Sequence, residues 1–413
     1  MKEEKQGSSL ESSLPAVVDN RKCAAVVSPR RKALEWCFEK GRPDSRDWSS
    51  ANRPTGTYTN RTPKKMMMNE RTTILTCLTA FLVMFMTQIQ TAGAQDVTSF
   101  SRTTSPLTSD QARQLKTFIE SNAADLASEN PQTVVDARKN LIAPLLRAGT
   151  SNVFREAFGK AFISSTESML TDSDTVSTFN LANAFQVLAF IRTGETNEML
   201  ARQLEEIKGS DSQADARRNS AASMLAISLK TTPPDLIRPR QYNSIMRSIL
   251  ASVTDAGRWS VLQREFEAMG AITANRNIPD DIRKKALENE ALILERTLSR
   301  MAASESGDLS RAVAPMILAL RSQFIGLTGA MRQTFQGTIS PALELVIRSA
   351  ETNWETIQGN MASRSSYTIA LQQSMVLHRL TSGVTDPNMD KTVSAWESGD
   401  RLEFRKSAAD WLK

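Results

Sequence analysis

Cysteine is nearly absent from this chain, and histidine is rarer still. The three cysteines, Cys23, Cys37 and Cys77, all lie in the first 94 residues, and His378 is the single histidine. Residues 95–413 therefore offer no thiol for a disulfide, a nucleophile or a metal site. A domain of about 300 residues buries enough apolar surface to fold without disulfides. A zinc site built from several histidines is excluded as well.

An excess of charge of one sign is also lacking in most of the chain. Of the 51 Lys and Arg and 45 Asp and Glu residues, residues 1–94 hold 15 and 9, which leaves 36 of each in residues 95–413. The net charge of +6 thus belongs to the first 94 residues. A charge-balanced domain has no general attraction for nucleic acid or for an anionic membrane. We expect its partner to be a protein or another extended macromolecule rather than nucleic acid.

One apolar run has the features of an export signal. Residues 74–86 read ILTCLTAFLVMFM, which is 13 residues without a charge. A membrane-spanning helix needs about 20 apolar residues, whereas the apolar part of a secretory signal has roughly 7 to 15. Ala92 and Ala94 then supply the small side chains that signal peptidase requires before its cut. We expect residues 66–94 to be a signal peptide that is cleaved between Ala94 and Gln95.

The position of this run, far from the first methionine, leaves two interpretations. In the first, translation starts at one of the methionines of residues 66–68, and residues 1–65 are an over-extended gene start or a disordered segment. In the second, the run is a short, uncut signal-anchor. Lys64 and Lys65 just before it supply the positive charge that favours the cytoplasmic side of a membrane. The first places residues 95–413 in a periplasm or outside the cell. The second tethers them to a membrane by a single pass, with the C-terminal domain outside.

Apolar residues beyond residue 107 recur at the spacing of an α-helix. Three rows show it, and each is predicted to be the apolar face of a single helix. They are Leu287, Ala291, Leu294, Leu298 and Met301; Ile317, Leu320, Phe324, Leu327 and Met331; and Leu343, Val346, Ala350, Trp354 and Ile357. Residues 179–191 are apolar nearly all round, which is typical of a helix covered by neighbours. Segments rich in Gly, Pro and Asn separate these patterns. We expect a flexible lead-in at 95–107 and an all-α domain at 108–413.

Short fragments of this domain look alike. VDARKN, ADARRN and DDIRKK each carry Asp two residues before Arg, and they begin at intervals of 79 and 66 residues. Each interval is close to two helix-pair units of ~33 to 40 residues. The three pairs are Asp136 with Arg138, Asp215 with Arg217, and Asp281 with Arg283. We expect each acid in the first turn of a helix and each guanidinium on an Asp of the adjacent repeat, which are structural roles.

These fragments resemble HEAT-repeat proteins. The most similar segments are PDDIRKKALENEAL, from Pro279, and LIAPLLRAGTSNVFREAFGKAF, from Leu141. LIAPLL, AVAPMI and TISPAL also place Pro144, Pro315 and Pro341 within apolar runs, as the first helix of that family often does. The resemblance implies stacked antiparallel helix hairpins, an α-solenoid or HEAT-like superhelix.

Few residues of the domain suit catalysis or cofactor binding. A serine triad would depend on His378, and no G-x-S-x-G motif accompanies it. With Leu371 and Met375 on its side of a helix, His378 is predicted to be a half-buried packing residue. Two carboxylates would suffice for a glycosidase, so a carboxylate-dependent hydrolase on a helical toroid is the enzymatic alternative. We predict no catalytic, cofactor-binding or metal-binding residue.

Three of the four tryptophans after residue 94 lie close to the C-terminus, at Trp354, Trp396 and Trp411. Phe404, Ala408 and Trp411 share one side of a predicted helix, which favours a helix that caps the end of a stack. The alternative is that Trp396 and Trp411 are exposed anchors for a binding partner.

These features predict an exported, non-catalytic helical-repeat protein that binds another macromolecule at the cell envelope or outside the cell. The hydrolase and a membrane-tethered scaffold are the alternatives.

N-terminal sequencing of the protein recovered from the exported fraction is expected to begin at Gln95. This result follows from the length of the apolar run and the small residues before the cut. A mature protein that begins upstream of residue 74 would instead establish the uncut signal-anchor.

Overall fold

The computed structural model describes residues 97–171, 176–209, 211–302 and 308–412. Within these ranges the chain is helical, and no residue is in a β-strand. The all-α prediction is therefore confirmed for this part of the chain. Residues 1–65 and the predicted signal peptide, with Ala92, Ala94 and the following Gln95, lie outside the described residues.

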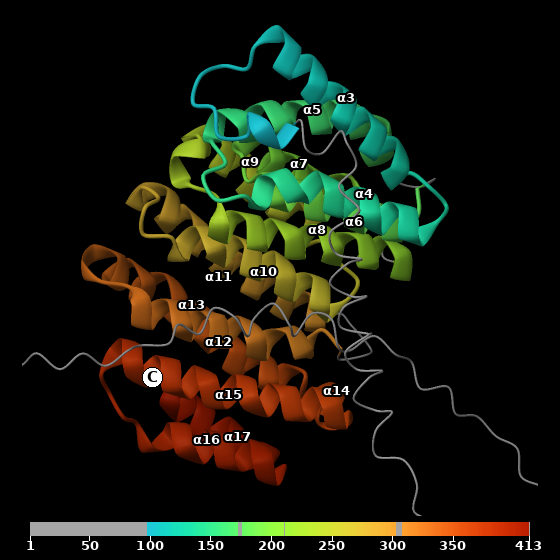
Figure 1. Ribbon diagram of the computed structural model, residues 1–413. Helices are drawn as coiled ribbons and strands as arrows, with labels where there is room; N and C mark the ends of the chain where they lie inside the picture. The colour runs from blue at the N-terminus through green and yellow to red at the C-terminus, as the bar shows by residue number, and fades with distance from the viewer. Residues whose placement is uncertain (1–96, 172–175, 210, 303–307, 413) are drawn as a thin grey trace, which may run out of the picture. The chain divides into compact units, whose positions relative to one another are not determined.

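The helices are labelled as in Figure 1. The first of them are α3 (Ser109–Leu126), α4 (Pro131–Ile142), the 3₁₀ turn η2 (Ala143–Leu146), α5 (Asn152–Thr171), α6 (Thr178–Ile191), α7 (Gly194–Glu206), α8 (Ser212–Thr231) and the 3₁₀ turn η3 (Pro234–Leu236). The others are α9 (Pro239–Ser252), α10 (Trp259–Ala274), α11 (Asp280–Ala302), α12 (Ser310–Gly326), α13 (Gly329–Thr352), α14 (Trp354–Gln358), α15 (Met361–Ser382), α16 (Pro387–Ser398) and α17 (Arg401–Trp411).

Capping residues in the sequence set many of the helix boundaries. The Thr108 hydroxyl accepts a hydrogen bond from the backbone N–H of Gln111, and the Gln111 side chain accepts one from the backbone N–H of Thr108. This capping box starts α3 next to the predicted boundary. Asp211 accepts hydrogen bonds from two backbone N–H groups of α8. Gly383 and Gly399 end α15 and α16 with φ of 71° and 76°, the left-handed region that favours glycine.

Helices that are close in the chain are also the ones that pack together. One series of contacts joins α4 to α6, α6 to α8, α8 to α10, α10 to α12 and α12 to α15. A second series joins α3 to α5, α5 to α7, α7 to α9, α9 to α11 and α11 to α13. Figure 1 shows the helices following one another in chain order. Buried apolar side chains form one cluster that extends from Val97 to Trp411.

Two of the three predicted apolar rows are divided between helices. The row from residue 287 to 301 lies wholly in α11, as predicted. The row from 317 to 331 crosses Leu327, which follows α12 and is extended, with φ −84° and ψ 150°. The row from 343 to 357 is interrupted at Asn353, between α13 and α14. Side chains on both sides of each break are buried, so the apolar spacing did not show where these helices end.

The prediction that the acid of each repeated fragment lies in the first turn of a helix is confirmed in two of three cases. Asp215 and Asp281 lie in the first turns of α8 and α11. Asp136 lies further along α4, which begins at Pro131. Its carboxylate accepts hydrogen bonds from the side chains of Gln132 and Lys139, at 2.8 and 3.2 Å. These bonds lower the pKa of Asp136. The prediction of a first-turn acid is wrong there, because the Asn130 cap starts α4 earlier.

Each arginine of the same fragments donates a hydrogen bond to a neutral group, and among the described residues neither Arg138 nor Arg283 has the predicted Asp of an adjacent repeat as a partner. The contacts are Arg138 with the side-chain oxygen of Gln186 at 2.7 Å, Arg217 with the carbonyl of Val176 at 2.9 Å, and Arg283 with the carbonyl of Thr273 at 3.0 Å. Thr273 lies in the last turn of α10, where carbonyls lack intrahelical donors. Arg283 also pairs with Asp280 of its own helix at 2.8 Å.

Arg155 of α5 donates hydrogen bonds to carbonyls at the ends of two other elements. Its Nη1 donates to the carbonyls of Phe190 and Ile191 at 2.9 and 3.2 Å, and its Nη2 donates to the carbonyl of Leu145 at 2.8 Å. These carbonyls belong to the C-terminal ends of α6 and η2. Burial lowers the pKa of Arg155 to about 10, which still leaves the guanidinium charged at neutral pH.

Part of segment 95–107, which was predicted to be flexible, is packed on the helices. Val97 and Phe100 are 1% and 6% exposed. The ring of Phe100 lies 6.0 Å from the ring of Phe154, centroid to centroid. Arg102 Nε donates to the carbonyl of Ala148 at 3.1 Å. The packed part of the chain therefore begins ahead of residue 108.

Replacing Arg155 by Met should lower the free energy of unfolding by about 2–4 kcal/mol, because it leaves three inward-facing carbonyls without donors. Arg155→Lys should recover only part of this loss, since an ammonium group does not reproduce the planar fork of a guanidinium. Urea unfolding followed by circular dichroism measures both effects.

Arg113→Met is the matched control, because the Arg113 side chain is 77% exposed and pairs only with the nearby exposed Asp110. It should change stability by less than about 0.5 kcal/mol. An equal loss for Arg113 and Arg155 would contradict the role assigned to Arg155.

Candidate functional site

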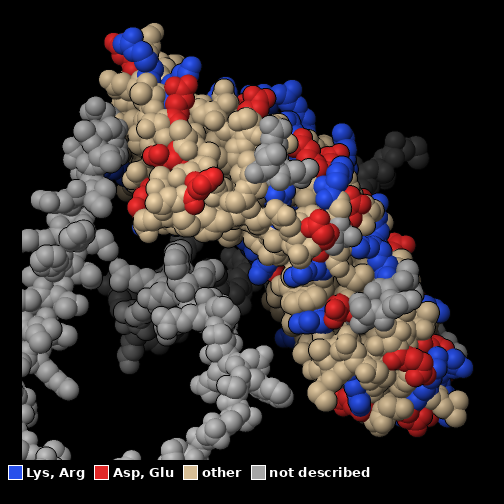
Figure 2. All heavy atoms as spheres, turned by 90° about the vertical axis from the view of Figure 1, so that its right-hand side faces the viewer, with Lys and Arg blue, Asp and Glu red and all other residues tan. Residues whose placement is uncertain are grey.

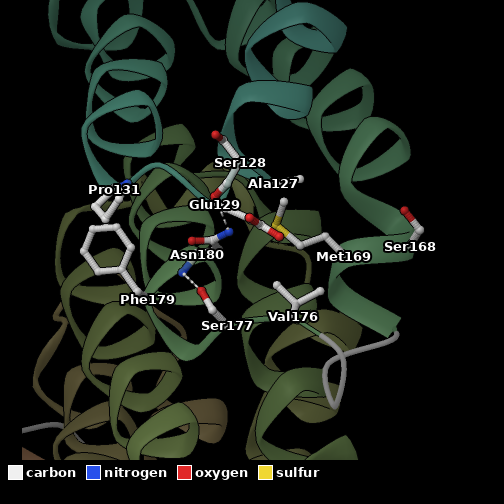
Figure 3. A pocket seen from close by; sticks show the side chains of 10 residues that line it. All are labelled: Ala127, Ser128, Glu129, Pro131, Ser168, Met169, Val176, Ser177, Phe179 and Asn180. Atoms are coloured by element: carbon white, nitrogen blue, oxygen red, sulfur yellow. Dashed lines mark hydrogen bonds between the residues drawn. The ribbon is translucent and has the colours of Figure 1, made fainter.

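One cavity of the described residues lies where two interhelical connections meet; we call it the corner pocket. Its volume is about 710 Å³. The lining residues come from the α3–α4 connection, the last turns of α5 and the start of α6: Ala127, Ser128, Glu129, Pro131, Ser168, Met169, Val176, Ser177, Phe179 and Asn180. Figure 3 shows Phe179 beside Pro131 on one side and Met169 with Val176 on the other, with Asn180 between them.

Hydrogen bonds fix the polar part of this pocket. The Ser177 hydroxyl caps α6 by accepting from the backbone N–H of Asn180 at 3.1 Å. The Asn180 Nδ2 donates to the carbonyl of Ser128 at 3.1 Å, which ties the start of α6 to the α3–α4 connection. Asn130 caps α4 and is itself held, since its N–H donates to the Ser128 hydroxyl at 3.1 Å. The two helix starts are therefore anchored to each other.

The apolar part of the pocket contains an unusual exposed aromatic residue. Phe179 is 46% exposed, whereas Met169 opposite is 6% exposed. An exposed phenyl ring beside a cavity is the kind of side chain that dominates binding energy when a partner covers it. Glu129 is the one ionisable residue among those that line the pocket. This arrangement of described residues suits an apolar side chain flanked by polar backbone.

Sequence reasoning missed Phe179 and Asn180, because residues 179–191 were predicted to be buried all round. Most of α6 is buried as predicted, including Leu181, Phe185 and Leu188. Phe179 differs because it occupies the first turn, beyond the helices that cover the rest of α6. The cap at Ser177 was the available signal, since it places Phe179 at the very start of the helix.

Two further cavities lie at other places in the fold. A groove of about 670 Å³ runs between α3 and α5, with Leu115, Val153 and Ala161 on its apolar wall and Glu156 as its acidic residue. A cavity of about 170 Å³ lies against α13, α15 and α17, with Glu344 as its acidic residue. The described residues that line each of these three cavities include a single carboxylate. None provides the pair of carboxylates that the hydrolase alternative requires.

The most strongly perturbed carboxylates lie in the interior instead. Glu265 of α10 and Glu290 of α11 are both 0% exposed. Glu265 accepts from the Ser252 hydroxyl at 2.6 Å. Glu290 accepts from the Thr273 hydroxyl at 2.8 Å and from the Gln323 amide at 2.6 Å. Burial raises the pKa of each to about 8.

Gly270 of α10 makes room for Glu290. A Cβ at this position would lie 2.5 Å from Gln323 Nε2 and 2.7 Å from Glu290 Oε1, which is closer than real Cβ contacts. The backbone of α10 thus approaches the hydrogen-bonded pair of side chains directly. Neither Glu265 nor Glu290 lines any of the three cavities, so these acids serve the packing of helices rather than an accessible site.

His378 is half-buried on α15, as predicted. Its ring meets the indole of Trp411 edge to face, with centroids 6.0 Å apart and an interplanar angle of 89°. Burial lowers the pKa of His378, and the neighbouring carboxylates of Asp386 and Glu344 oppose that change. The imidazole is thus a packing group between α15 and α17.

The two tryptophans considered as binding anchors are interior residues in this structure. Trp396 is 0% exposed, and its indole N–H donates to the Thr368 hydroxyl at 3.0 Å. Its ring packs against Trp354 at 5.0 Å and Phe404 at 5.7 Å. Trp411 is 6% exposed. Phe404, Ala408 and Trp411 form the buried face of α17 that was predicted. Neither tryptophan has a free face in the corner pocket.

The residues that the structure describes hold neither a cluster of metal ligands nor a membrane-spanning helix. No three acidic, histidine or cysteine side chains gather there as ligands around a metal ion would. Across the same residues, no helix combines the length and the apolar character of a membrane span. Comparison with protein-family models, with curated proteins and with solved structures gave no match in any of the three.

The two buried glutamates predict that stability falls as pH rises. In the unfolded chain a glutamate ionises near pH 4.5, whereas Glu265 and Glu290 keep their protons in the folded state up to about pH 8. Their contribution is therefore fully present below pH 4.5 and is lost as pH rises toward 8. Each group should lower the free energy of unfolding by about 1.4 kcal/mol per pH unit within this window.

Urea unfolding of the wild type and of the Glu265→Gln and Glu290→Gln variants between pH 5 and 8 isolates this contribution. Each glutamine keeps one acceptor oxygen but cannot ionise, so each variant should lose less stability over the window than the wild type. Identical pH slopes in all three proteins would show that these carboxyls do not titrate as described.

Proposed function

We propose that residues 95–413 form an exported α-solenoid that binds a segment of a partner protein at the corner pocket. The observation that carries this proposal is Phe179, an exposed aromatic residue on the wall of a cavity of about 710 Å³. The protein would act by holding its partner, without catalysing a reaction.

The solenoid part of the proposal is supported by the order of the helix contacts. In a stack of repeats, each unit packs on its neighbours and distant units do not meet. The two series of contacts, with α4, α6, α8, α10 and α12 in one and α3, α5, α7, α9 and α11 in the other, have this character. Pro315 and Pro341 lie inside α12 and α13, as in the HEAT proteins that the sequence resembles. Pro144 differs, since it lies in η2.

A protein partner is favoured by the chemistry of the surface. Figure 2 shows Lys and Arg side chains interspersed with Asp and Glu over the face that it displays. Such a mixture gives no continuous positive field for a nucleic-acid backbone. The pocket itself combines a phenyl ring and a thioether with serine hydroxyls, which suits an apolar side chain flanked by hydrogen-bonding main chain.

Export is supported by the sequence of residues 66–95 alone. A cleaved signal would release the domain into a periplasm or outside the cell, and an uncut one would make it a membrane-tethered scaffold. Sequencing of the mature N-terminus separates these two cases. Binding is preferred to the hydrolase alternative because, among the described residues, none of the three cavities brings two carboxylates together.

Site-specific crosslinking tests the binding surface. A photoreactive amino acid at position 179 should capture a partner from the exported fraction of the native host, because that side chain would lie under the bound segment. The same group at Ile325, which is 67% exposed on α12, is the matched control and should capture none.

The partner identified in this way is then purified and its affinity measured by calorimetry. Phe179→Asp should weaken binding by about 30-fold or more, as for an aromatic anchor, while Ile325→Asp should leave it unchanged. Equal crosslinking at both positions, or unchanged affinity of the Phe179 variant, would rule out the corner pocket as the binding site.

A further inference from the structure

The connection between α9 and α10, residues 253–258, is held by arginines from two other helices. Arg218 of α8 donates from Nη1 to the carbonyl of Asp255 at 3.1 Å. Arg300 of α11 donates from Nη1 to the carbonyl of Val253 at 2.6 Å and from Nη2 to the carbonyl of Ala256. The turn therefore has its carbonyls bound by guanidinium groups of helices that precede and follow it in the chain.

Acidic groups complete this arrangement. The Asp215 carboxylate accepts from the backbone N–H of Gly257 at 2.9 Å and lies 3.6 Å from Arg218 Nη1. It also lies 3.8 Å from Arg258 Nε. The Asp255 carboxylate lies 4.0 Å from Arg218 Nη2. With Glu265 protonated, the cluster holds three guanidinium groups and two carboxylates, so one positive charge is not balanced within it.

Glu265 is the buried acid of the same cluster. It lies on α10, and the charged groups that act on it are Arg218 and Asp215 of α8 and Arg300 of α11. From α9 it receives the hydroxyl of Ser252, and among the described residues no charged group of α12 acts on it. Its second oxygen, Oε2, and the Nε of Arg218 are both buried without a hydrogen-bond partner. An acceptor and a donor are thus unused in one buried cluster.

Ionisation of Glu265 would change which groups the guanidiniums hold. A hydrogen bond from arginine to a carboxylate is about twice as strong as one to a neutral acceptor. An ionised Glu265 would balance the extra positive charge and compete with the carbonyls of Asp255, Val253 and Ala256 for Arg218 and Arg300. Burial raises the pKa of Glu265 to about 8, so this change lies within an accessible pH range.

We propose that ionisation of Glu265 controls how firmly the α9–α10 connection, which we call the joint, is held in place. Protonated Glu265 leaves Arg218 and Arg300 hydrogen-bonded to the carbonyls of the turn, and ionised Glu265 draws the two guanidinium groups away from them. The joint links the α8–α9 pair to the α10–α11 pair. Raising the pH would loosen this link while the helices themselves remain intact. The inference concerns the interior of the fold and is independent of the corner pocket.

Hydrogen exchange measured by mass spectrometry on the full chain tests this joint. Exchange is followed at pH 6 and pH 9.5, and each rate is divided by the intrinsic rate at that pH. Peptides that cover residues 253–258 should lose at least 10-fold in protection at the higher pH. The α3–α4 connection, residues 127–130, is the internal control and should not change.

Variants distinguish a change in the protection of this connection from a loss of stability of the whole domain. Glu265→Gln should abolish the pH response of residues 253–258, and Arg300→Met should lower their protection at both pH values. Arg296→Met is the matched control, because Arg296 lies on the same helix but donates to Leu250 within α9, at 2.7 Å. Ser252→Ala removes a hydrogen bond that favours the ionised carboxyl, and it should move the midpoint to higher pH.

The proposal is overturned if Glu265→Gln keeps the full pH response, or if residues 127–130 lose protection to the same extent as residues 253–258. Should the Glu265 variant fail to fold, Ser252→Ala decides: an unchanged midpoint would equally overturn it.

Discussion

The constraint on which this fold depends is that helix ends in the interior must have their carbonyls satisfied. The last carbonyls of a helix have no intrahelical donor, and leaving them buried and unbound costs stability. Here arginine side chains from neighbouring helices supply the donors. Arg155 does so for α6 and η2, Arg283 for α10, and Arg300 for the end of α9. Each of these bonds also fixes the position of one helix relative to another.

This use of arginine is consistent with the order in which the helices pack. A guanidinium reaches the end of a helix that is one or two steps away, and the helix contacts extend over the same steps. Buried acids also lie in this interior, beside arginines in one case and beside neutral donors in the other. Glu265 lies among Arg218 and Arg300, whereas Glu290 depends on neutral donors from Thr273 and Gln323. The interior thus combines an apolar core with polar contacts between successive helices.

The helical nature of the domain could be predicted from the sequence because apolar spacing reports directly on which side of a helix is buried. Helix breaks could not, since Leu327 is itself a buried member of its apolar row, and the buried residues Ala350 and Trp354 keep the helical spacing across Asn353. The partners of the repeated arginines were also missed. A backbone carbonyl leaves no mark in the sequence, whereas an Asp does.

The candidate site depended even more on three-dimensional packing. Phe179 could not be distinguished from the buried residues of the same apolar run, because its exposure depends on where the covering helices end. Glu265 and Glu290 had no feature that separates them from surface glutamates, and their burial follows from helices distant in sequence. Trp396, which had seemed a candidate for recognition by its position near the C-terminus, is a core residue because α16 packs on α15 and α17.

In the proposed solenoid, each described helix packs on its near neighbours, so that the first and last described helices stay apart. Lysine-specific chemical crosslinking of the isolated monomer tests it most directly, because Lys116 and Lys160 on α3 and α5, and Lys391 and Lys406 on α16 and α17, are all exposed. Crosslinks should form within each of these two groups or to adjacent helices. Intramolecular crosslinks between the two groups, as a closed toroid would give, would contradict the account.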